Sequence, residues 1–283
     1  MLLSQSEVDS IVSTILRSKK YRGMSISRDT VYDLVTQEFP RYKKKTDVIK
    51  AVKGKLHHVV APYLGNPDYE SAARELRSAY ETNDWTAIKK TCLNIMAAHA
   101  SSRERLSFVA DFYRTIFDVT GKPGVLSDIA CGLNPLSFPW MELPNSTLYY
   151  AYDLYGERVD FLNVFFTLQG LTPLAKFQDV LVTVPAEQSD VALILKEMHR
   201  FEQRHRGCTL SLLDALRAEY IVVSLPAMNL SGRRNLVAHH QRLFYTVVKE
   251  RAWQVTEIQI ENELVFIIRK DILAVCQSGK RYP

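Results

Sequence analysis

The chain has 283 residues, 47% of them hydrophobic and 24% charged, which is typical of a globular protein with one large or two smaller domains. It lacks an apolar run close to the roughly 18 residues of a membrane helix, and its first ten residues do not have the pattern of a secretory signal. The four cysteines are widely spaced without a CxxC pair, which disfavours a disulfide framework or a metal site and predicts a cytoplasmic protein with reduced thiols.

The net charge of +5 is concentrated at the start of the chain. The first 60 residues contain 12 lysines and arginines against 6 acidic residues, whereas the remainder contains 24 basic and 25 acidic residues. A localised basic face is expected where a protein contacts a phosphate backbone. The alternative is a solvated helical surface, and composition alone leaves both interpretations open.

Helical patterns without strand-like alternation occupy the first hundred residues. Apolar residues at helical spacing predict five helices, over residues 4–17, 30–40, 48–59, 69–80 and 85–96. Two basic segments lie between the first three of them, SKKYR at 18–22 and RYKKK at 41–45. We therefore expect residues 1–98 to form an all-α domain with a basic N-terminal half.

A further helix is predicted from about residue 99 to residue 117. Ser101 and Glu104 have the spacing of a capping box, and apolar residues between Leu106 and Phe117 supply a buried face. Arg105 would then lie in the first turn, where the helix dipole disfavours a cation. Such an arginine is either an ordinary surface residue or has an anionic partner nearby.

From Val125 onward, short apolar runs alternate with helical stretches. Five runs are predicted to be strands, over residues 125–130, 147–153, 175–180, 189–197 and 219–226. Two further runs, 253–260 and 263–269, are separated by Glu261-Asn262 and predict an antiparallel hairpin. We therefore expect residues 99–283 to form an α/β domain with a doubly wound, mostly parallel sheet of seven strands and an antiparallel edge.

The segment VLSDIACGLNP, residues 125–135, is predicted to be the first strand and the turn that follows it. Gly132 gives this turn the freedom to pass close to a ligand, and Pro135 suits the first turn of a helix. In open α/β sheets, ligands bind at this edge of the sheet.

Three acids follow one another at predicted strand ends, Asp128, Asp153 and Asp179. Asp153 comes 25 residues after Asp128, a separation that fits one βαβ unit whose second acid accepts hydrogen bonds from ribose hydroxyls. Asp179 would then lie one strand further along, near an adenine. The alternative is that these acids only cap the next helices. Three acids in order after a small-residue turn favour a nucleotide cofactor.

The turn ACGLNP contains a single glycine, whereas pyrophosphate cofactors need a turn of the GxGxxG type. S-adenosylmethionine has no phosphate and requires only a close backbone approach. The C-terminal hairpin is also more typical of a methyltransferase than of a dehydrogenase. These features favour S-adenosylmethionine as the cofactor.

With these residues, the chain resembles the aminoglycoside-resistance 16S ribosomal RNA (guanine-N7)-methyltransferases. The resemblance rests on DIACGLNPLSFPWM, preceded by HASSRERL and followed by AYD, QDV and LILK, with SKKYR and KLHHVVAPY near the start. It implies a helical domain that docks on the 30S subunit and a Rossmann-like class I methyltransferase domain. The expected reaction is transfer of a methyl group from S-adenosylmethionine to N7 of guanine-1405 in the decoding site of 16S rRNA.

The resemblance also implies roles for individual residues. Arg105 would hold the methionine carboxylate, Asp153 the ribose hydroxyls, and Asp179 with Val180 would frame the adenine. The other implied cofactor-binding residues are Tyr63, His99, Ala100, Ser101, Ala130, Gly132, Leu195, Lys196 and Arg204. The basic segments and the resemblance together predict RNA contacts by Lys19, Lys20, Arg22, Lys43, Lys44, Lys45, Lys53, Lys55, His57, His199, Arg233 and Arg234. No residue is expected to act as a general acid or base, because guanine N7 carries a lone pair and no proton.

The chain departs from the family pattern in two segments that the resemblance places beside the target guanine. LPAMNLSGRRNLVAHH, residues 225–240, lacks the family's Lys-Gly-Met, and Lys196-Glu197-Met198-His199 replaces Lys-x-Leu-Pro. Two alternatives therefore stand beside the main hypothesis: a methyltransferase for another RNA site, and a ribosome-binding protein with a vestigial cofactor pocket. We expect the partner to be 16S rRNA in the assembled 30S subunit, with no membrane partner, and we expect a monomer.

Overall fold

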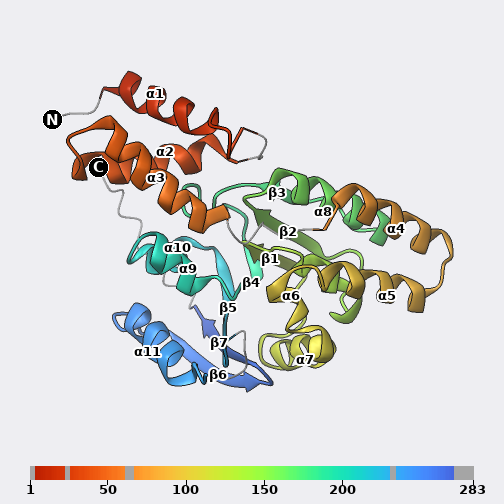
Figure 1. Ribbon diagram of the computed structural model, residues 1–283. Helices are drawn as coiled ribbons and strands as arrows, with labels where there is room; N and C mark the ends of the chain where they lie inside the picture. Colours follow the sequence, from red (N-terminus) through yellow and green to blue (C-terminus); the bar gives the residue numbers. More distant parts are fainter. Residues whose placement is uncertain (1–3, 23–25, 61–66, 230–233, 271–283) are drawn as a thin grey trace.

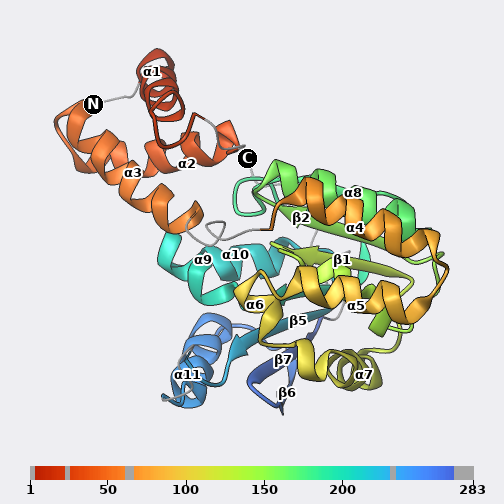
Figure 2. The same ribbon diagram turned by 45° about the vertical axis from the view of Figure 1, so that its right-hand side comes forward.

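The computed structural model describes residues 4–22, 26–60, 67–229 and 234–270. Its helical part begins with a lobe of three α-helices (Figures 1 and 2). They are α1 (Gln5–Leu16), α2 (Arg28–Glu38) and α3 (Lys45–Val60), with a short 3₁₀ turn η1 (Phe39–Arg41) between the last two. Apolar residues at helical spacing on all three helices pack into a core of their own.

Tyr21 of the basic SKKYR segment belongs to this small core. Its ring is 2% exposed, and its hydroxyl donates to the Lys53 carbonyl of α3 at 3.0 Å. The aromatic residue therefore fixes the turn after α1 against α3, while the neighbouring Lys19, Lys20 and Arg22 stay exposed. The turn presents its cations outward because its aromatic residue faces inward.

The α/β part is a seven-stranded sheet with strand order β3-β2-β1-β4-β5-β7-β6. The first five strands are parallel, and β7 runs antiparallel to both of its neighbours. This confirms the predicted fold class, a mostly parallel sheet that ends in an antiparallel hairpin. The strands are β1 (Val125–Ile129), β2 (Leu148–Asp153), β3 (Ala175–Phe177), β4 (Ser189–Leu195), β5 (Ala218–Pro226), β6 (Gln254–Ile260) and β7 (Glu263–Arg269).

Helices cover both faces of the sheet, because successive side chains of each buried strand point to opposite faces. In β4, for example, Val191 and Leu193 pack on one face, and Ala192 and Ile194 on the other. The first face is covered by α4 (Tyr69–Glu81), α5 (Trp85–Met96), α7 (Val109–Thr120), α8 (Gly156–Gln169) and the 3₁₀ helix η4 (Asn134–Trp140). The second is covered by α9 (Met198–Arg204), α10 (Cys208–Ala215) and α11 (Val237–Val248).

The apolar packing separates α1–α3 from everything that follows. Helices α4 and α5 share the core of the sheet, while α1–α3 do not contribute to it. The break in packing therefore precedes residue 67, and the predicted domain division at residue 98 stays a prediction. None of the helices in the described ranges is both long and apolar enough to cross a membrane.

The continuous helix predicted over residues 99–117 is wrong. The chain forms a single turn, α6 (Ala100–Arg103), a 3₁₀ turn, η3 (Leu106–Phe108), and only then α7. Glu104 does not complete a capping box but pairs with Lys196 at 2.7 Å. Arg105 lies at the break and pairs with Glu263 on β7. Ion pairs with distant strands therefore override the local helical pattern here.

The third predicted strand is shorter than expected. Residues 175–180 were predicted to be extended, but β3 ends at Phe177. Asp179 lies beyond it, where its carboxylate accepts from the Leu181 amide at 3.1 Å. The acid thus closes a turn rather than ending a strand.

A candidate cofactor and substrate cavity

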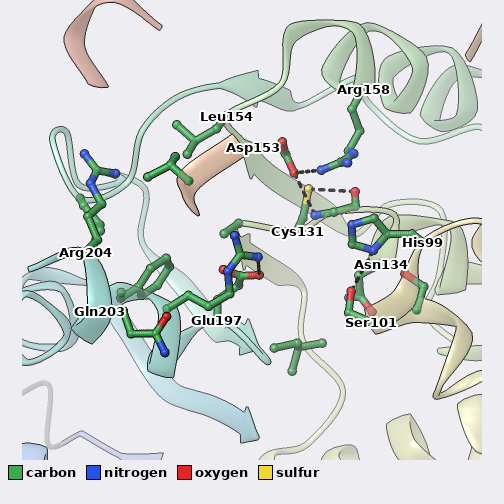
Figure 3. A pocket seen from close by; sticks show the side chains of 18 of the residues that line it. His99, Ser101, Cys131, Asn134, Asp153, Leu154, Arg158, Glu197, Gln203 and Arg204 are labelled. Atoms are coloured by element: carbon green, nitrogen blue, oxygen red, sulfur yellow. Dashed lines mark hydrogen bonds and ion pairs between the residues drawn. The ribbon is translucent and has the colours of Figure 1, made fainter. Parts of the chain in front are cut away.

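A cavity of about 330 Å³ opens at the carboxyl edge of the parallel strands, a volume in the range of small-molecule sites (Figure 3). Helix α3 of the N-terminal lobe contributes to its wall, so the lobe and the sheet together form the site. The wall consists of Lys55, Val59, His99, Ser101, Ser102, Arg105, Ala130, Cys131, Gly132, Asn134, Asp153, Leu154, Arg158, Leu181, Leu195, Glu197, Arg200, Phe201, Gln203 and Arg204.

The floor of the cavity is the turn after β1. Ala130 and Gly132 both have positive φ, 54° and 56°, which turns the chain sharply beneath the cavity. The Gly132 amide donates to Asp153 Oδ2 at 3.0 Å. A Cβ atom on Gly132 would lie 3.3 Å from Cε1 of His99, a tight contact. The glycine is therefore needed both for its backbone conformation and for the imidazole that packs against it.

Asp153 ends β2 at the cavity wall, as predicted for a ribose-binding acid. Its Oδ2 accepts from Arg158 Nη1 at 2.8 Å, and its Oδ1 accepts from the Tyr155 amide at 2.9 Å. Arg158 is 1% exposed, and its Nε donates to the Tyr69 hydroxyl at 2.9 Å. This support for Asp153 was missed from the sequence, although an arginine in the first turn after an acid-ended strand was a usable signal.

Below the floor, Asp128 belongs to a buried network rather than to the cavity wall. Its Oδ2 accepts from Asn134 Nδ2 at 2.9 Å and from the Tyr149 hydroxyl at 2.8 Å. The Oδ1 atom of Asn134 accepts in turn from Arg105 and Tyr113. Burial raises the pKa of Asp128 to about 7, although Asn134 and Tyr149 oppose the shift.

Arg105 is 2% exposed and lines the cavity. Its Nε and Nη2 donate to the two oxygens of Glu263 at 2.7 and 2.8 Å, and its guanidinium stacks over Phe112 at 4.2 Å. Burial alone would lower the pKa of Arg105, but Glu263, Tyr113 and Asp128 together outweigh burial and the pKa is raised. The role of Arg105 toward a methionine carboxylate stays a prediction.

Glu263 is fully buried at the start of β7 and was not predicted to belong to the site. Besides Arg105 it contacts Lys196 Nζ at 3.2 Å. Burial would raise the pKa of Glu263, but the two cations outweigh it and the pKa is lowered. Lys196 has a positive φ of 61°, which is rare for a residue with a side chain. Its ammonium also contacts Glu104, so β4, β7 and the α6 segment are joined at one point.

Asp179 is buried beside the cavity and faces the N-terminal lobe. It accepts from Thr30 Oγ1 on α2 at 2.7 Å and pairs with Arg204 Nη1 at 2.7 Å. Arg204 also binds Asp33 of α2 at 2.8 Å. On this side Leu181 and Arg204 line the cavity, whereas the buried Asp179 and Val180 are not among its described lining residues.

Helix α9 forms the wall opposite His99 and Ser101 (Figure 3). Glu197, the residue before this helix, and Arg200 within it both lie in the wall, with Glu197 Oε1 accepting from Arg200 Nη1 at 2.9 Å. Burial raises the pKa of Glu197 to about 7, and Arg200 opposes this only in part. Burial also lowers the pKa of His99 to about 4. Within the described residues, no group of His, Cys, Asp and Glu could hold a metal ion.

The predicted RNA-contacting residues cluster on the N-terminal lobe. Lys43, Lys44 and Lys45 are exposed around the start of α3. Lys20 Nζ lies 3.0 Å from His57 Nδ1, which joins the turn after α1 to α3. Lys55 pairs with the buried Glu38 at 2.7 Å and lines the cavity, so it links the lobe surface to the site. Lys53 is half-buried on α3.

The remaining predicted residues are dispersed. His199 is half-buried on α9, with its ring 5.9 Å from that of His240, and burial lowers its pKa to about 4. Arg234 is exposed before α11. Ala100 begins α6 between the wall residues His99 and Ser101. Tyr63 and Arg233 lie outside the described residues.

The chain is similar to several proteins whose names state their activity. The sequence model of the ribosomal RNA methyltransferase (FmrO) family matches residues 17–267. The chain is 31% identical, over 94% of its length and 95% of the relative, to a 16S rRNA (guanine(1405)-N(7))-methyltransferase of Frankia casuarinae. The solved structure of the 16S rRNA methylase RmtB matches with a TM-score of 0.74 and 25% identity over 93% of this chain and 98% of RmtB. RmtF, a 16S rRNA methyltransferase solved with S-adenosyl-L-homocysteine, matches with the same score and identity over 95% of this chain and all of RmtF.

Proposed function

The chain belongs to the FmrO family of ribosomal RNA methyltransferases, and from this membership we propose the reaction that it catalyses. It transfers the methyl group of S-adenosylmethionine to N7 of a guanine in the decoding site of 16S rRNA, the guanine-1405 of its relatives' names. The product is a small subunit that resists aminoglycosides. The protein acts as a monomer in the cytoplasm on assembled 30S subunits.

The observation that carries this proposal is the construction of the cavity. Asp153 offers a carboxylate at the end of β2, where a ribose binds in this class of sheet. The turn beneath the cavity has one glycine, held close under His99, and no second glycine for a pyrophosphate. Leu154 and Leu181 supply apolar wall for an adenine. These residues fit S-adenosylmethionine and do not fit a dinucleotide.

The chemistry places few demands on the protein. When bound, S-adenosylmethionine supplies a methyl group that is already electrophilic, and guanine N7 attacks with a lone pair without losing a proton. No general base is required, and the chain's task is to align two reactants and exclude water. The neutral imidazole of His99 suits this task, because its lowered pKa keeps a second cation away from the sulfonium at neutral pH.

The N-terminal lobe supports a large RNA substrate rather than a free nucleotide. Lys55 and Val59 of α3 lie in the cavity wall, and the exposed cations of α3 continue outward from there. RNA held on these cations would therefore present a base at the cavity mouth. A base inside a helix must leave its stack to reach the cavity, as for other enzymes that modify bases.

The decisive experiment maps the product. Purified 30S subunits are incubated with the protein and labelled S-adenosylmethionine, and the modified nucleotide is located by primer extension. We expect one methylated guanine in the decoding site. Asp153→Ala, which removes the ribose acceptor, should reduce cofactor affinity at least about tenfold, since hydrogen bonds to a charged group contribute roughly 1.5–3 kcal/mol. Absence of label with the unaltered protein would contradict the proposal.

A second candidate is methylation of a different nucleotide of the same RNA. It is favoured by the two segments that depart from the family pattern, residues 196–199 and 225–240. The same mapping separates the candidates, because a single stop at another position would identify the other target. A ribosome-binding protein with a vestigial pocket is disfavoured by the preserved supports of Asp153 and Gly132.

A further inference from the structure

An enzyme that methylates guanine N7 cannot recognise guanine in the commonest way. Proteins usually read guanine by an arginine that donates to both N7 and O6. Here the N7 lone pair must stay available for the methyl group. Recognition therefore has to use the other edge of the base, where O6 accepts and N1–H and the N2 amino group both donate. Two adjacent donors are best matched by one carboxylate.

Two carboxylates lie in the described wall of the cavity, Asp153 and Glu197. Asp153 already accepts from the Gly132 and Tyr155 amides and from Arg158, and its position suits a ribose. Glu197 lies on the other side, immediately before α9, and its side chain accepts within the described chain from Arg200 through Oε1. Its side chain is 18% exposed, so it is open to the cavity. Glu197 is therefore the acid available to a base.

The backbone fixes Glu197 in this position. Lys196 just before it has a φ of 61°, and the Lys196 ammonium pairs with Glu104 and Glu263, while Lys196 itself is not among the described lining residues. Strained residues of this kind persist where surrounding contacts hold them, and they cluster at functional sites. Two such residues follow the adjacent central strands, Ala130 after β1 and Lys196 after β4. Ala130 and Glu197, which follows Lys196, both line the cavity.

We propose that Glu197 is the specificity-determining residue that accepts from N1–H and the N2 amino group of the target guanine, with Arg200 beside it donating to O6. This inference rests on the proposed function and names how its substrate base is selected. From N2 to O6, the guanine edge presents a donor, a donor and an acceptor. The two carboxylate oxygens of Glu197 and the guanidinium of Arg200 present an acceptor, an acceptor and a donor in the same order. Adenine presents an acceptor at N1 and a donor at N6, so it mismatches the pair.

The protonation behaviour of the free protein agrees with this role. Burial raises the pKa of Glu197 to about 7, which means that its carboxylate is short of donors in the free protein. Arg200, Asp153 and Arg158 are the charged groups that act on it, and only the two arginines favour its ionised form. The two N–H groups of a bound guanine would supply the missing donors.

The test compares Glu197→Gln with Glu142→Gln. A glutamine has the same shape, accepts with one atom only and donates with the other, so it loses one bond to guanine and can donate to the N1 acceptor of adenine. Glu142 is a control of equal chemistry, 81% exposed beside Lys122, next to the start of β1 and away from the cavity. Methyl transfer is measured on 30S subunits whose target nucleotide is guanine or adenine, and cofactor affinity by calorimetry.

We expect Glu197→Gln to lower kcat/KM on guanine about 10- to 100-fold, the discrimination of a bidentate base contact. Cofactor affinity should stay within about twofold, and the ratio of adenine to guanine methylation should rise. Unchanged activity on guanine would overturn the inference, as would a parallel loss of cofactor affinity, which would assign Glu197 to the ammonium group of the cofactor. If the unaltered protein methylates no guanine, the proposed function itself fails.

Discussion

At the scale of single residues, Asp128 illustrates how an acid can support a site without facing it. Its carboxyl group is fully buried below the cavity floor, where Asn134 and Tyr149 donate to one oxygen. The other oxygen, Oδ1, has no hydrogen-bond partner among the described residues. An unpaired buried oxygen favours the neutral acid, which explains the pKa of about 7.

This pKa predicts a stability that depends on pH. The folded protein holds the Asp128 proton between pH 3.8 and about 7, whereas the unfolded chain releases it near 3.8. The free energy of unfolding therefore falls as pH rises through this window, by about 2 kcal/mol between pH 5 and pH 7 from this group. Asp128→Asn should remove that dependence. Urea unfolding of the unaltered protein and of the Asp128→Asn variant at pH 5 and pH 7 measures this change in the free energy of unfolding.

The difference in pH dependence between the unaltered protein and the Asp128→Asn variant reports the titration of Asp128 alone. Glu197 has a similar pKa but is present in both, so its contribution cancels. Equal losses of unfolding free energy in the two proteins would show that Asp128 is already ionised when folded.

The three acids noticed in the sequence show what spacing can and cannot predict. All three were predicted to end strands; Asp153 does end β2 and lines the cavity, whereas Asp128 lies within β1 and Asp179 lies beyond the end of β3. Their directions were not predictable, because each depends on a partner from a distant element. Tyr149 keeps Asp128 below the floor, Arg158 holds Asp153 at the wall, and Arg204 with Thr30 turns Asp179 toward α2.

At the scale of elements, helix α2 is fastened to the α/β part by one buried cation. Arg204 at the end of α9 pairs with Asp179 and with Asp33 of α2, and its side chain is 6% exposed. Asp179 raises the pKa of Arg204 above the value that burial alone would give. Removal of the cation would leave Asp179 buried without a counter-charge, the costly way to break such a pair.

We expect Arg204→Ala to lower the free energy of unfolding by about 3 kcal/mol and to weaken S-adenosylmethionine binding, because Arg204 also lines the cavity. Arg206→Ala is the matched control, an exposed arginine two residues further along. Denaturant unfolding and calorimetry measure the two effects. Identical unfolding curves for the two variants would show that the α2 contact contributes nothing to stability.

Elements with regular spacing were predictable, and elements held by ion pairs were not. Helices α1 to α5 and the order of strand, helix and hairpin follow from hydrophobic periodicity alone. The breaks around Arg105 follow from Glu263, which lies 158 positions later in the chain. A sequence pattern read over a short window cannot include a partner at that separation.

At the scale of the whole molecule, the part of the chain that carries the basic charge also forms part of the site. The lobe α1–α3 carries most of the basic excess and also reaches the cavity through α3 (Figure 2). The core of the lobe is separate from the cores on the two faces of the sheet, but Arg204 of α9 pairs with Asp33 of the lobe, and Lys55 of α3 lies in the cavity wall. The lobe is therefore both the RNA-facing surface of the proposed enzyme and a wall of its site, so RNA docking and cavity geometry depend on the same helix.

The final prediction tests the RNA-facing surface directly. Reversal of Lys43, Lys44 and Lys45 to glutamate should weaken binding to 30S subunits. It should also reduce the magnitude of the slope of log K against log salt concentration, where K is the association constant. The magnitude of this slope should fall by about 2, since each of the three lost phosphate contacts of a flexible or single-stranded RNA contributes roughly 0.7. Reversal of Arg74, Arg77 and Lys90 makes the same change of net charge at exposed positions on α4 and α5.

Because net charge is matched, any difference between the two triple variants reports local phosphate contacts rather than the overall field of the protein. If the control variant lowers the slope equally, the lobe attracts RNA only as part of the whole molecule. If only the α3 variant lowers it, phosphates sit at the start of α3. The target base would then be delivered along that helix, past Lys55, to the wall that carries Glu197.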